Sequence, residues 1–567
     1  MENVSRFISF VSFSCIPSFW NEGNQTLHDQ IHAAYAAFSM NFSIAIFPTI
    51  AILIITSSAF SRLFKSKTRK SYVPLPPGPQ PWPLVGSLPE LLYSGPGYKW
   101  FHSLLDSYEK PILCVRLGSV HVIAVNSPDI AREFLKKHDA VFASRPITMA
   151  TSYSSRGFLS IAVVPWGDQW KKMRRVVASE VLTASRLKWL QGKRMEEADN
   201  LVHWIWNQCS AQSPAQPNTF LNVRYAVRHY SANVIRKLIF NRRYFTNEGG
   251  SNEGGPTSEE EEHVNALFKV LSLLYNMCVS DYMPCLRWLD IGGNERDMKK
   301  AIHVVDKYHI PLIEERFRLR RGCTSLEEPH DLLDVLISIK DSTDGSPLLR
   351  LEEIKSQLAD LTYATVDNPS NAVEWALAEM LLQPEIMQKA VEEIDRVVGK
   401  DRLVHESDLG HLKYVKACVK EALRLHPVAP FNLPHMSMED VTVAGYHIPK
   451  GSHVLLSRVG LGRNPCVWED PLRFCPERFL KDDSRLGVEL GDPELRLISF
   501  STGRRGCMGA ALGTAMTVML LARLLHCFHW STSSMAPIHL QEGPSDLFMA
   551  NPLHAIARPR LPRILYP

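Results

Sequence analysis

The sequence predicts a mostly α-helical catalytic domain with a small β part, placed behind a membrane-spanning segment. Long stretches repeat apolar residues every three or four positions, which is typical of helices with one buried face. These stretches cover residues 195–206, 351–382, 384–398, 412–425 and 510–525. Short runs near residues 114–125 and 441–456 alternate apolar and polar side chains, as strands do. An uncharged apolar segment near the N-terminus completes the prediction.

The composition is typical of a globular protein: of 567 residues, 45% are hydrophobic and 22% are charged. The formal charge of +4 is too small for this length to favour nucleic-acid binding. The 11 cysteines form no C-x-x-C pair, which disfavours a zinc site or a disulfide framework and fits reduced thiols in the cytosol. Because no Walker-type loop and no G-x-G-x-x-G stand out, we expect electrons to come from a partner protein.

Residues 42–60 are predicted to cross a membrane as one helix. The segment is uncharged and nearly as long as the ~20 residues that a bilayer core requires, and its shortness suits the endoplasmic reticulum. Five basic residues follow it: Arg62, Lys65, Lys67, Arg69 and Lys70. The positive-inside rule therefore puts residues 1–41 in the lumen and the catalytic domain in the cytosol, so that Asn24 becomes a glycosylation acceptor. The alternatives are a buried core helix at 42–60 and a signal peptide built on residues 7–19.

Residues 61–83 form the predicted link between this anchor and the catalytic domain, which spans residues 84–567. The basic collar leads into prolines that fix φ and remove amide donors: Pro74, Pro76, Pro77, Pro79, Pro81 and Pro83. Such a stretch is predicted to be a stiff, extended spacer. Farther along, Ser258 and Glu261 have the spacing of a capping box, so we expect a helix to begin there.

A single cysteine near the C-terminal end gives the strongest functional signal. The pattern F-x-x-G-x-R-x-C-x-G is complete in this chain, with fixed positions at Phe500, Gly503, Arg505, Cys507 and Gly509. A thiol just before a helix lies among backbone N–H groups that favour the thiolate, and a thiolate is an axial ligand for haem iron. The alternative is a buried structural cysteine.

This loop resembles the haem-binding signature of the cytochrome P450 superfamily. The resemblance covers about residues 74–567 and implies a triangular-prism fold, a haem b cofactor and NADPH electrons delivered by a cytochrome P450 reductase. It implies contacts to the haem propionates from Trp170, Arg174, His435 and Arg505, and a buried bracing network of Glu421, Arg424 and Arg478. A basic rim that attracts an acidic reductase is expected from Lys171, Lys172, Arg175 and Arg504, although an ordinary solvated face would look the same.

The predicted helix over residues 351–382 departs from most oxygenases of the superfamily. Where those place an acid and an alcohol to relay protons to dioxygen, this chain has Asp367 followed by Asn368. We expect both to be catalytic, with Asn368 donating a hydrogen bond to bound oxygen or to the substrate. Pro369 removes one helical hydrogen bond and is expected to kink the helix. The alternative is that Asn-Pro-Ser ends one helix and caps another.

Asn-Pro-Ser in this setting resembles one branch of the superfamily, the plant amino acid N-monooxygenases of family 79. Residues 228–230, 457–464 and 499–507 resemble that branch as well. The resemblance implies two N-hydroxylations of an L-amino acid, then dehydration and decarboxylation to an aldoxime, which leads to defence compounds such as cyanogenic glucosides or glucosinolates. An apolar substrate pocket, with phenylalanine or tyrosine favoured, is expected from Val428, Phe431, Asn432, Phe548 and Met549.

Other functions stay open at this level. A different plant microsomal oxygenase fits the same motifs, and a reductase-independent haem-thiolate isomerase or lyase fits the missing alcohol. A non-catalytic haem-binding or partner-binding protein would turn over no substrate. Consumption of NADPH and dioxygen with an amino acid separates these possibilities.

Overall fold

The computed structural model describes residues 73–567 except 211–219, 244–256, 323–327, 481–489 and 533–536. The predicted lumenal segment, membrane helix, glycosylation acceptor and basic collar lie outside the described residues. Residues 71–567 form one compact unit.

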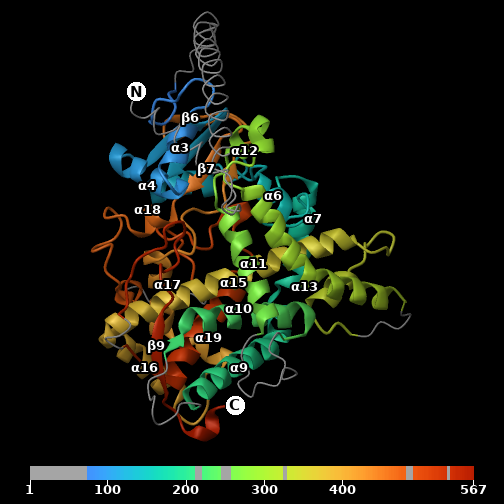
Figure 1. The fold of residues 1–567 in the computed structure, drawn as a ribbon, viewed down its shortest axis with the longest axis vertical. Coiled ribbons are helices and arrows are strands. Elements are labelled where there is room, and N and C mark those ends of the chain that lie inside the picture. Colours follow the sequence, from blue (N-terminus) through green and yellow to red (C-terminus); the bar gives the residue numbers. More distant parts are fainter. Residues whose placement is uncertain (1–72, 211–219, 244–256, 323–327, 481–489, 533–536) are drawn as a thin grey trace, which may run out of the picture. The chain divides into compact units, whose positions relative to one another are not determined.

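Helices make up most of the described chain (Figure 1). Up to residue 290 they are α3 (Leu88–Tyr93), α4 (Gly97–Tyr108), α5 (Pro128–Arg132), α6 (Met149–Ser154), α7 (Asp168–Val176), α8 (Ala184–Trp189), α9 (Gln191–Ser210), α10 (Val223–Phe240), α11 (Ser258–Leu274) and α12 (Val279–Tyr282). Beyond it they are α13 (Asn294–Gly322), α14 (Leu332–Ser338), α15 (Leu351–Leu382), α16 (Pro384–Val398), α17 (Lys413–Leu425), α18 (Arg458–Gly462) and α19 (Ala510–Cys527). All five helical stretches predicted from periodicity are helices here, and α15 and α16 have the predicted bounds.

The strands bring together segments that are far apart in the sequence. They are β1 (Ile112–Leu117), β2 (Val120–Val125), β3 (Leu221–Asn222), β4 (His435–Met436), β5 (Val441–Val443), β6 (Tyr446–Ile448), β7 (His453–Leu456), β8 (Phe528–Ser531) and β9 (His554–Pro559). The largest sheet has the order β1-β2-β7-β4, and only its β2–β7 pair is parallel, with Val122 opposite His453. This sheet matters for the site because β4 begins at His435 and β7 leads into α18.

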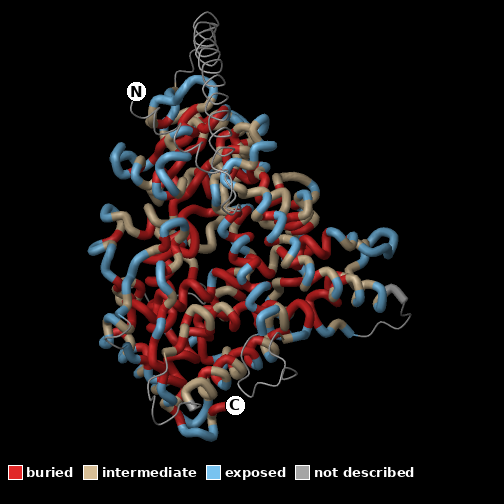
Figure 2. Tube along the Cα trace, viewed as in Figure 1, coloured by how far each residue is buried: buried red, intermediate tan, exposed pale blue. Residues whose placement is uncertain are grey.

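The core is built around α15, which packs against α10, α17 and α19 (Figure 1). Buried residues concentrate along these helices in Figure 2. On α15 the Trp375 ring stacks on His426 with 3.9 Å between ring centroids, and its Nε1 donates to the Leu547 carbonyl at 3.0 Å. The stack joins α15 to the end of α17. Helix α15 is buried on nearly all sides, so polar residues such as Glu353 and Asp367 are enclosed along with its apolar ones.

Among the described residues, α19 alone is long and apolar enough to cross a membrane, and 83% of it is buried within the domain. A helix that is apolar all round and covered by its neighbours is a core helix. The helix therefore carries the segment after the cysteine loop into the centre of the protein.

The proline-rich segment is docked on the domain. The Pro77 carbonyl accepts from Cys114 N on β1 at 2.8 Å, and the Pro74 carbonyl accepts from His447 N on β6 at 2.8 Å. A Cβ at Gly78 would lie 1.8 Å from the Cys114 carbonyl oxygen, so only glycine allows this approach. As predicted, the proline-rich segment is extended and forms no helix. It is bonded to β1 and β6, however, whereas a separate spacer was expected.

One helix start is corrected. Helix α11 does begin at Ser258, but its N-cap is Thr257, whose hydroxyl accepts from Glu260 N. Threonine and serine serve equally as caps, so the pattern alone did not decide between neighbours.

A carboxylate in α17 organises the chain that leads towards the cysteine loop. Glu421 accepts from Arg424 Nε and Nη2, both at 2.7 Å, from Arg478 Nε at 3.0 Å and from Cys475 N at 2.8 Å. Arg424 also donates to the carbonyls of Gly462 and Pro471, at 2.5 and 2.6 Å. The side chains of Glu421 and Arg424 are both fully buried, so every contact is made away from water.

We predict that Glu421→Ala lowers the free energy of unfolding by about 3–5 kcal/mol, because it leaves the buried guanidinium of Arg424 without its counter-charge. Urea denaturation of the holoprotein measures this change. Asp129→Ala is the matched control, since Asp129 and Arg132 form an exposed pair worth at most about 1 kcal/mol. Equal losses in the two variants would contradict the bracing role.

Candidate active site

Most of the predicted haem-site and catalytic residues meet in one cavity of about 310 Å³ between α7, α15 and the loop before α19. The predicted residues that line it are Trp170, Arg174, Asp367, Asn368, Asn432, His435, Phe500, Arg505 and Cys507. Much of the remaining wall is apolar, with Val163, Leu271, Leu361 and Leu512 among its residues. Gly503 belongs to the same loop but does not face the cavity.

The loop shape presents the thiol to the cavity. Cys507 N donates to the Phe500 carbonyl at 2.8 Å, which closes the loop three residues before α19 begins. Gly503 has a φ of +74°, and a Cβ there would lie 2.6 Å from both Asp139 Oδ1 and the Leu135 carbonyl oxygen. The exposed Cys507 therefore lies next to the positive end of a helix, as the pattern predicts.

Buried cations gather beside the thiol. Arg505 donates to the carbonyls of Ala143 and Val164 at 2.6 and 2.7 Å. Burial, together with repulsion from Arg145 and Arg174, lowers the pKa of Arg505 to about 8. Cations in such a group repel one another, and an anionic ligand relieves that repulsion.

Trp170 and His435 complete the part of the cavity wall that carries Arg174 and Arg505. The Trp170 ring lies 4.8 Å from the Arg505 guanidinium and 5.5 Å from that of Arg174, so it orders both cations. His435 Nδ1 lies 2.8 Å from the Phe142 carbonyl and donates to it, and burial lowers the pKa of His435 to about 3. A neutral ring of this tautomer presents Nε2 as an acceptor. The propionate contact implied for His435 would therefore require a second proton on the ring.

The lining suits haem. The cavity offers a thiolate for iron, an apolar wall for the flat ring and arginines for the two carboxylates. Positive side chains in the lining outnumber negative ones: Arg145, Arg174, Arg458 and Arg505 against Asp360 and Asp367. Cys507 would hold the iron, and Arg174 and Arg505 with Trp170 would hold the propionates.

Helix α15 forms the opposite wall. Asp367 is 4% exposed, and its Oδ1 has no hydrogen-bond partner among the described residues. Burial raises the pKa of Asp367 to about 7, although Arg228 and Arg458 oppose the shift. Asn368 faces the cavity, and its Nδ2 donates to the Ala364 carbonyl at 2.9 Å.

The helix continues through Pro369 without a break from Leu351 to Leu382. Polar side chains on both sides of the proline bond back to carbonyls one turn earlier, Thr365 Oγ1 to Leu361 at 2.7 Å and Ser370 Oγ to Val366 at 2.8 Å. Such side-chain bonds compete with the backbone ladder and accompany bending. The alternative of two separate helices is not found.

Of the five residues predicted for the substrate pocket, only Asn432 lines the cavity. Val428 and Met549 are core residues, Phe431 stacks on His102 at 4.9 Å between centroids, and Phe548 lies against the Arg228 guanidinium at 5.1 Å. They lie in the layers around the cavity, where they pack against other residues.

The predicted basic rim is partly neutralised. Lys172 Nζ bonds both carboxylate oxygens of the buried Glu353, at 3.0 and 2.9 Å. Arg504 pairs with Asp139 at 2.7 Å, and Lys171 with Asp168 at 3.2 Å. Arg175 is exposed. Lys172 is thus an internal tie between α7 and α15, which sequence spacing could not reveal.

The lining residues that were not predicted include Arg458, Tyr275 and Asp360. Asp360 Oδ2 accepts from Ala162 N at 2.9 Å, and burial raises the pKa of Asp360 to about 6. Arg458 lies two residues after the apolar run of β7, and a charged residue so close to the end of a buried strand was the signal that could have identified it.

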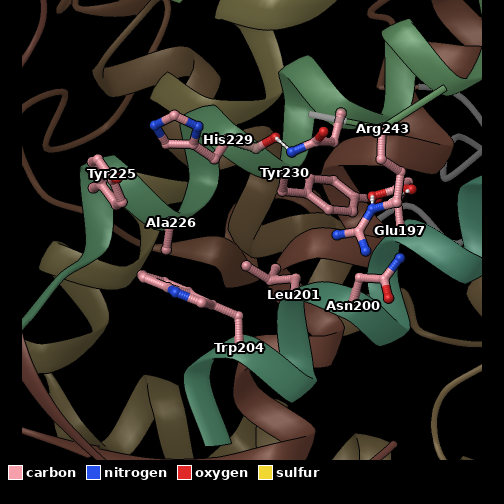
Figure 3. Close-up of a pocket in the computed structure, with 10 residues that line it drawn as sticks. Glu197, Asn200, Leu201, Trp204, Tyr225, Ala226, His229, Tyr230 and Arg243 are labelled. Atoms are coloured by element: carbon pink, nitrogen blue, oxygen red, sulfur yellow. Dashed lines mark hydrogen bonds and ion pairs between the residues drawn. The ribbon is translucent and has the colours of Figure 1, made fainter. Parts of the chain in front are cut away.

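A second cavity lies between α9 and α10 (Figure 3). It holds about 20 Å³, roughly the space of one water molecule. Glu197 and Arg243 pair there at 3.1 Å, and burial raises the pKa of Glu197 to about 7. This polar gap is too small for a substrate.

Comparison with known proteins agrees with the geometry. The cytochrome P450 family model matches residues 76–557. A tryptophan N-monooxygenase of Prunus mume is 56% identical, with 88% of this chain and 93% of that enzyme covered. A phenylalanine N-monooxygenase of Arabidopsis thaliana is 55% identical (87% and 92% covered), and a valine N-monooxygenase of Manihot esculenta is 49% identical (93% and 96% covered).

Among solved structures, a zebrafish cytochrome P450 with abiraterone has a TM-score of 0.64 at 24% identity, and the match covers 82% of this chain and 100% of that one. This likeness confirms the predicted fold.

We predict that Gly503→Ala reduces the fraction of protein with thiolate-ligated haem several-fold. The added methyl group would collide with the Leu135 carbonyl oxygen, and residue 503 has a left-handed backbone conformation that alanine rarely adopts. The carbon monoxide difference spectrum of the reduced protein measures this fraction. Gly399→Ala is the control: its φ of +80° is equally unfavourable for alanine, but no atom lies within 4 Å of the added Cβ. If both variants retain the same fraction, the close approach at Gly503 has no role in shaping the loop.

Proposed function

This chain belongs to the cytochrome P450 family, and we propose that it converts an L-amino acid to its aldoxime by two N-hydroxylations, a dehydration and a decarboxylation. The observation that carries the proposal is its relatives: proteins 49–56% identical to it are named N-monooxygenases of tryptophan, phenylalanine, tyrosine, valine and isoleucine. The family uses haem b and takes electrons from a reductase. We also propose the endoplasmic reticulum membrane as its location and plant defence metabolism as its setting.

The residues of the cavity divide the work. Bound haem activates dioxygen, with two electrons and two protons consumed for each oxygen atom inserted. Cys507 would hold the iron of bound haem, and Arg174 and Arg505 would hold its propionates. The apolar wall excludes water from the reacting nitrogen, which limits unproductive loss of electrons.

Asp367 is placed to handle protons. An amino acid arrives with an ammonium group, and its nitrogen must lose a proton before an N–O bond forms. Asp367 Oδ1 makes no hydrogen bond within the described chain, and the burial that raises the pKa of this carboxyl to about 7 lets it accept or return a proton near neutral pH. Asn368 uses one N–H on the Ala364 carbonyl and keeps its second N–H and its Oδ1 for the substrate or the oxygen.

The proposed substrate is an aromatic amino acid, phenylalanine or tyrosine. Leucine, isoleucine and valine side chains supply much of the lining, which favours a large apolar side chain. Discrimination between such side chains rests on about 1–3 kcal/mol per methylene, so closely related enzymes differ in their preferred substrate.

The central prediction is formation of an oxime. Purified holoprotein with a plant cytochrome P450 reductase and NADPH is given each protein amino acid, and we expect mass spectrometry to detect the aldoxime of phenylalanine or tyrosine. Cys507→Ala should form none. Product formed without NADPH would favour the isomerase or lyase reading, and absence of oxime from every amino acid would contradict the proposal.

A second prediction concerns pH. Burial raises the pKa of Asp367 from 3.8 to about 7, against the opposing effects of Arg228 and Arg458, so the proton-accepting carboxylate is lost as the pH falls through about 7. The rate of oxime formation should fall with it, and Asp367→Asn should remove that limb of the pH–rate profile while lowering the maximal rate about 10²–10⁴-fold. Asp360→Asn is the control, because an amide oxygen can still accept from Ala162 N. An unchanged limb in Asp367→Asn would exclude the role.

A further inference from the structure

We propose that Arg458, held in place by Asn432, binds the α-carboxylate of the amino acid substrate. The inference rests on the proposed function and assigns the head-group subsite within the same cavity. Arg458 and Asn432 both line that cavity, and Arg458 is close enough to Asp367 on α15 to act on it electrostatically.

The two residues are fixed on paired segments of chain. Asn432 N donates to the Leu456 carbonyl at 3.1 Å, and Arg458 N donates to the Pro430 carbonyl at 2.9 Å. Phe431 and Ser457 form a bridge between these bonds. Arg458 is also the first residue of α18, so its backbone cannot shift without moving the end of the sheet. The site is rigid, as a site for a small polar group requires.

The side chains leave donors for a ligand. Arg458 Nε donates to Asn432 Oδ1 at 2.6 Å, and within the described chain this is the one hydrogen bond of that guanidinium. Asn432 is 4% exposed, and its Nδ2 is buried without a hydrogen-bond partner among the described residues. The two terminal nitrogens of Arg458 and the amide of Asn432 form a set of donors with no acceptor. A carboxylate accepts from all of them.

This pair shares Tyr275 and Cys507 as neighbours with Arg145 and Arg174, but among these arginines only Arg458 also interacts with Asp367. Arg505 and Arg145 bond the backbone at Ala143, Val164, Leu433 and Pro434, which lies beside His435. The titratable neighbours of Arg458 are Tyr275, Cys507 and Asp367, and of these Asp367 is the carboxyl group. Arg458 and Asp367 both line the cavity and carry opposite charges. Arg458 can therefore pair with the carboxylate of a zwitterion, and Asp367 with its ammonium group.

The chemistry of the reaction gives this subsite a second use. The N-hydroxylated and N,N-dihydroxylated amino acids keep their α-carboxylate, so Arg458 holds each of them for the next step. Loss of water from the N,N-dihydroxylated amino acid and then of carbon dioxide leaves a neutral aldoxime. The aldoxime has no carboxylate for Arg458 to bind, so it dissociates.

The test compares each amino acid with its decarboxylated amine, for example L-phenylalanine with 2-phenylethylamine. Binding to the oxidised holoprotein is followed by the shift of the haem absorption band, which requires no turnover. Arg458→Met should weaken amino acid binding about 100-fold and amine binding less than about threefold. Arg458→Lys keeps the charge without the planar fork and should recover part of the loss.

Arg228→Met is the matched control. Arg228 also acts electrostatically on Asp367, but it lies against Phe268 at 3.8 Å and does not line the cavity. It should leave the ratio of acid to amine binding unchanged. An unchanged ratio of amino acid to amine binding in both Arg458 variants would overturn the inference. Equal losses of amino acid and amine binding together with loss of haem would also overturn it, because they would mark Arg458 as a propionate ligand. Oxime formation by the wild type alongside such results would leave the proposed function standing, whereas a wild type that binds no amino acid would end both.

Discussion

The carboxylate of Glu421 is the contact on which the arrangement of the site depends. It is fully buried, and it is offset by two guanidinium groups and a backbone amide. Through Arg424 it holds the carbonyls of Gly462 and Pro471, so the chain between α18 and the cysteine loop is tied to α17. A Cβ at Gly462 would lie 2.1 Å from the Arg424 carbonyl oxygen, which shows how closely this segment approaches the helix. Desolvating these charges is tolerable only because each one is paired.

The cavity separates two electrostatic tasks. On one side Arg145, Arg174 and Arg505 crowd together among backbone carbonyls, which suits a ligand with two negative charges. On the other side Arg458 and Asp367 form a pair of opposite signs, which suits a zwitterion. Local burial, more than net charge, sets the behaviour of each group: burial lowers the pKa of Arg505 to about 8 and raises that of Asp367 to about 7.

Sequence patterns predicted what is local and missed what depends on packing between distant segments. Helices α15 and α16 have the expected bounds because Pro384 separates two helical stretches, and the cysteine loop is recognisable because its fixed positions are close in sequence. Phe431 and Phe548 were expected in the substrate pocket, but their places are set by His102 and Arg228, from distant elements. The roles of Lys172 and Arg458 were missed for the same reason. The partner of Lys172, Glu353, lies on another helix, and the carboxylate binding proposed for Arg458 depends on Asn432 from another segment.

The docked proline segment has a mechanical consequence. Its carbonyls are bonded to β1 and β6, and Gly78 lies against the backbone of β1. A force applied to the chain ahead of Val73 is therefore received by strands, where it shears rows of hydrogen bonds. Strand β1 passes that load to β2 and then to β7, which ends two residues before Arg458. Through the Pro77 contact, a pull on the proline segment and the proposed carboxylate site at Arg458 thus act on the same sheet.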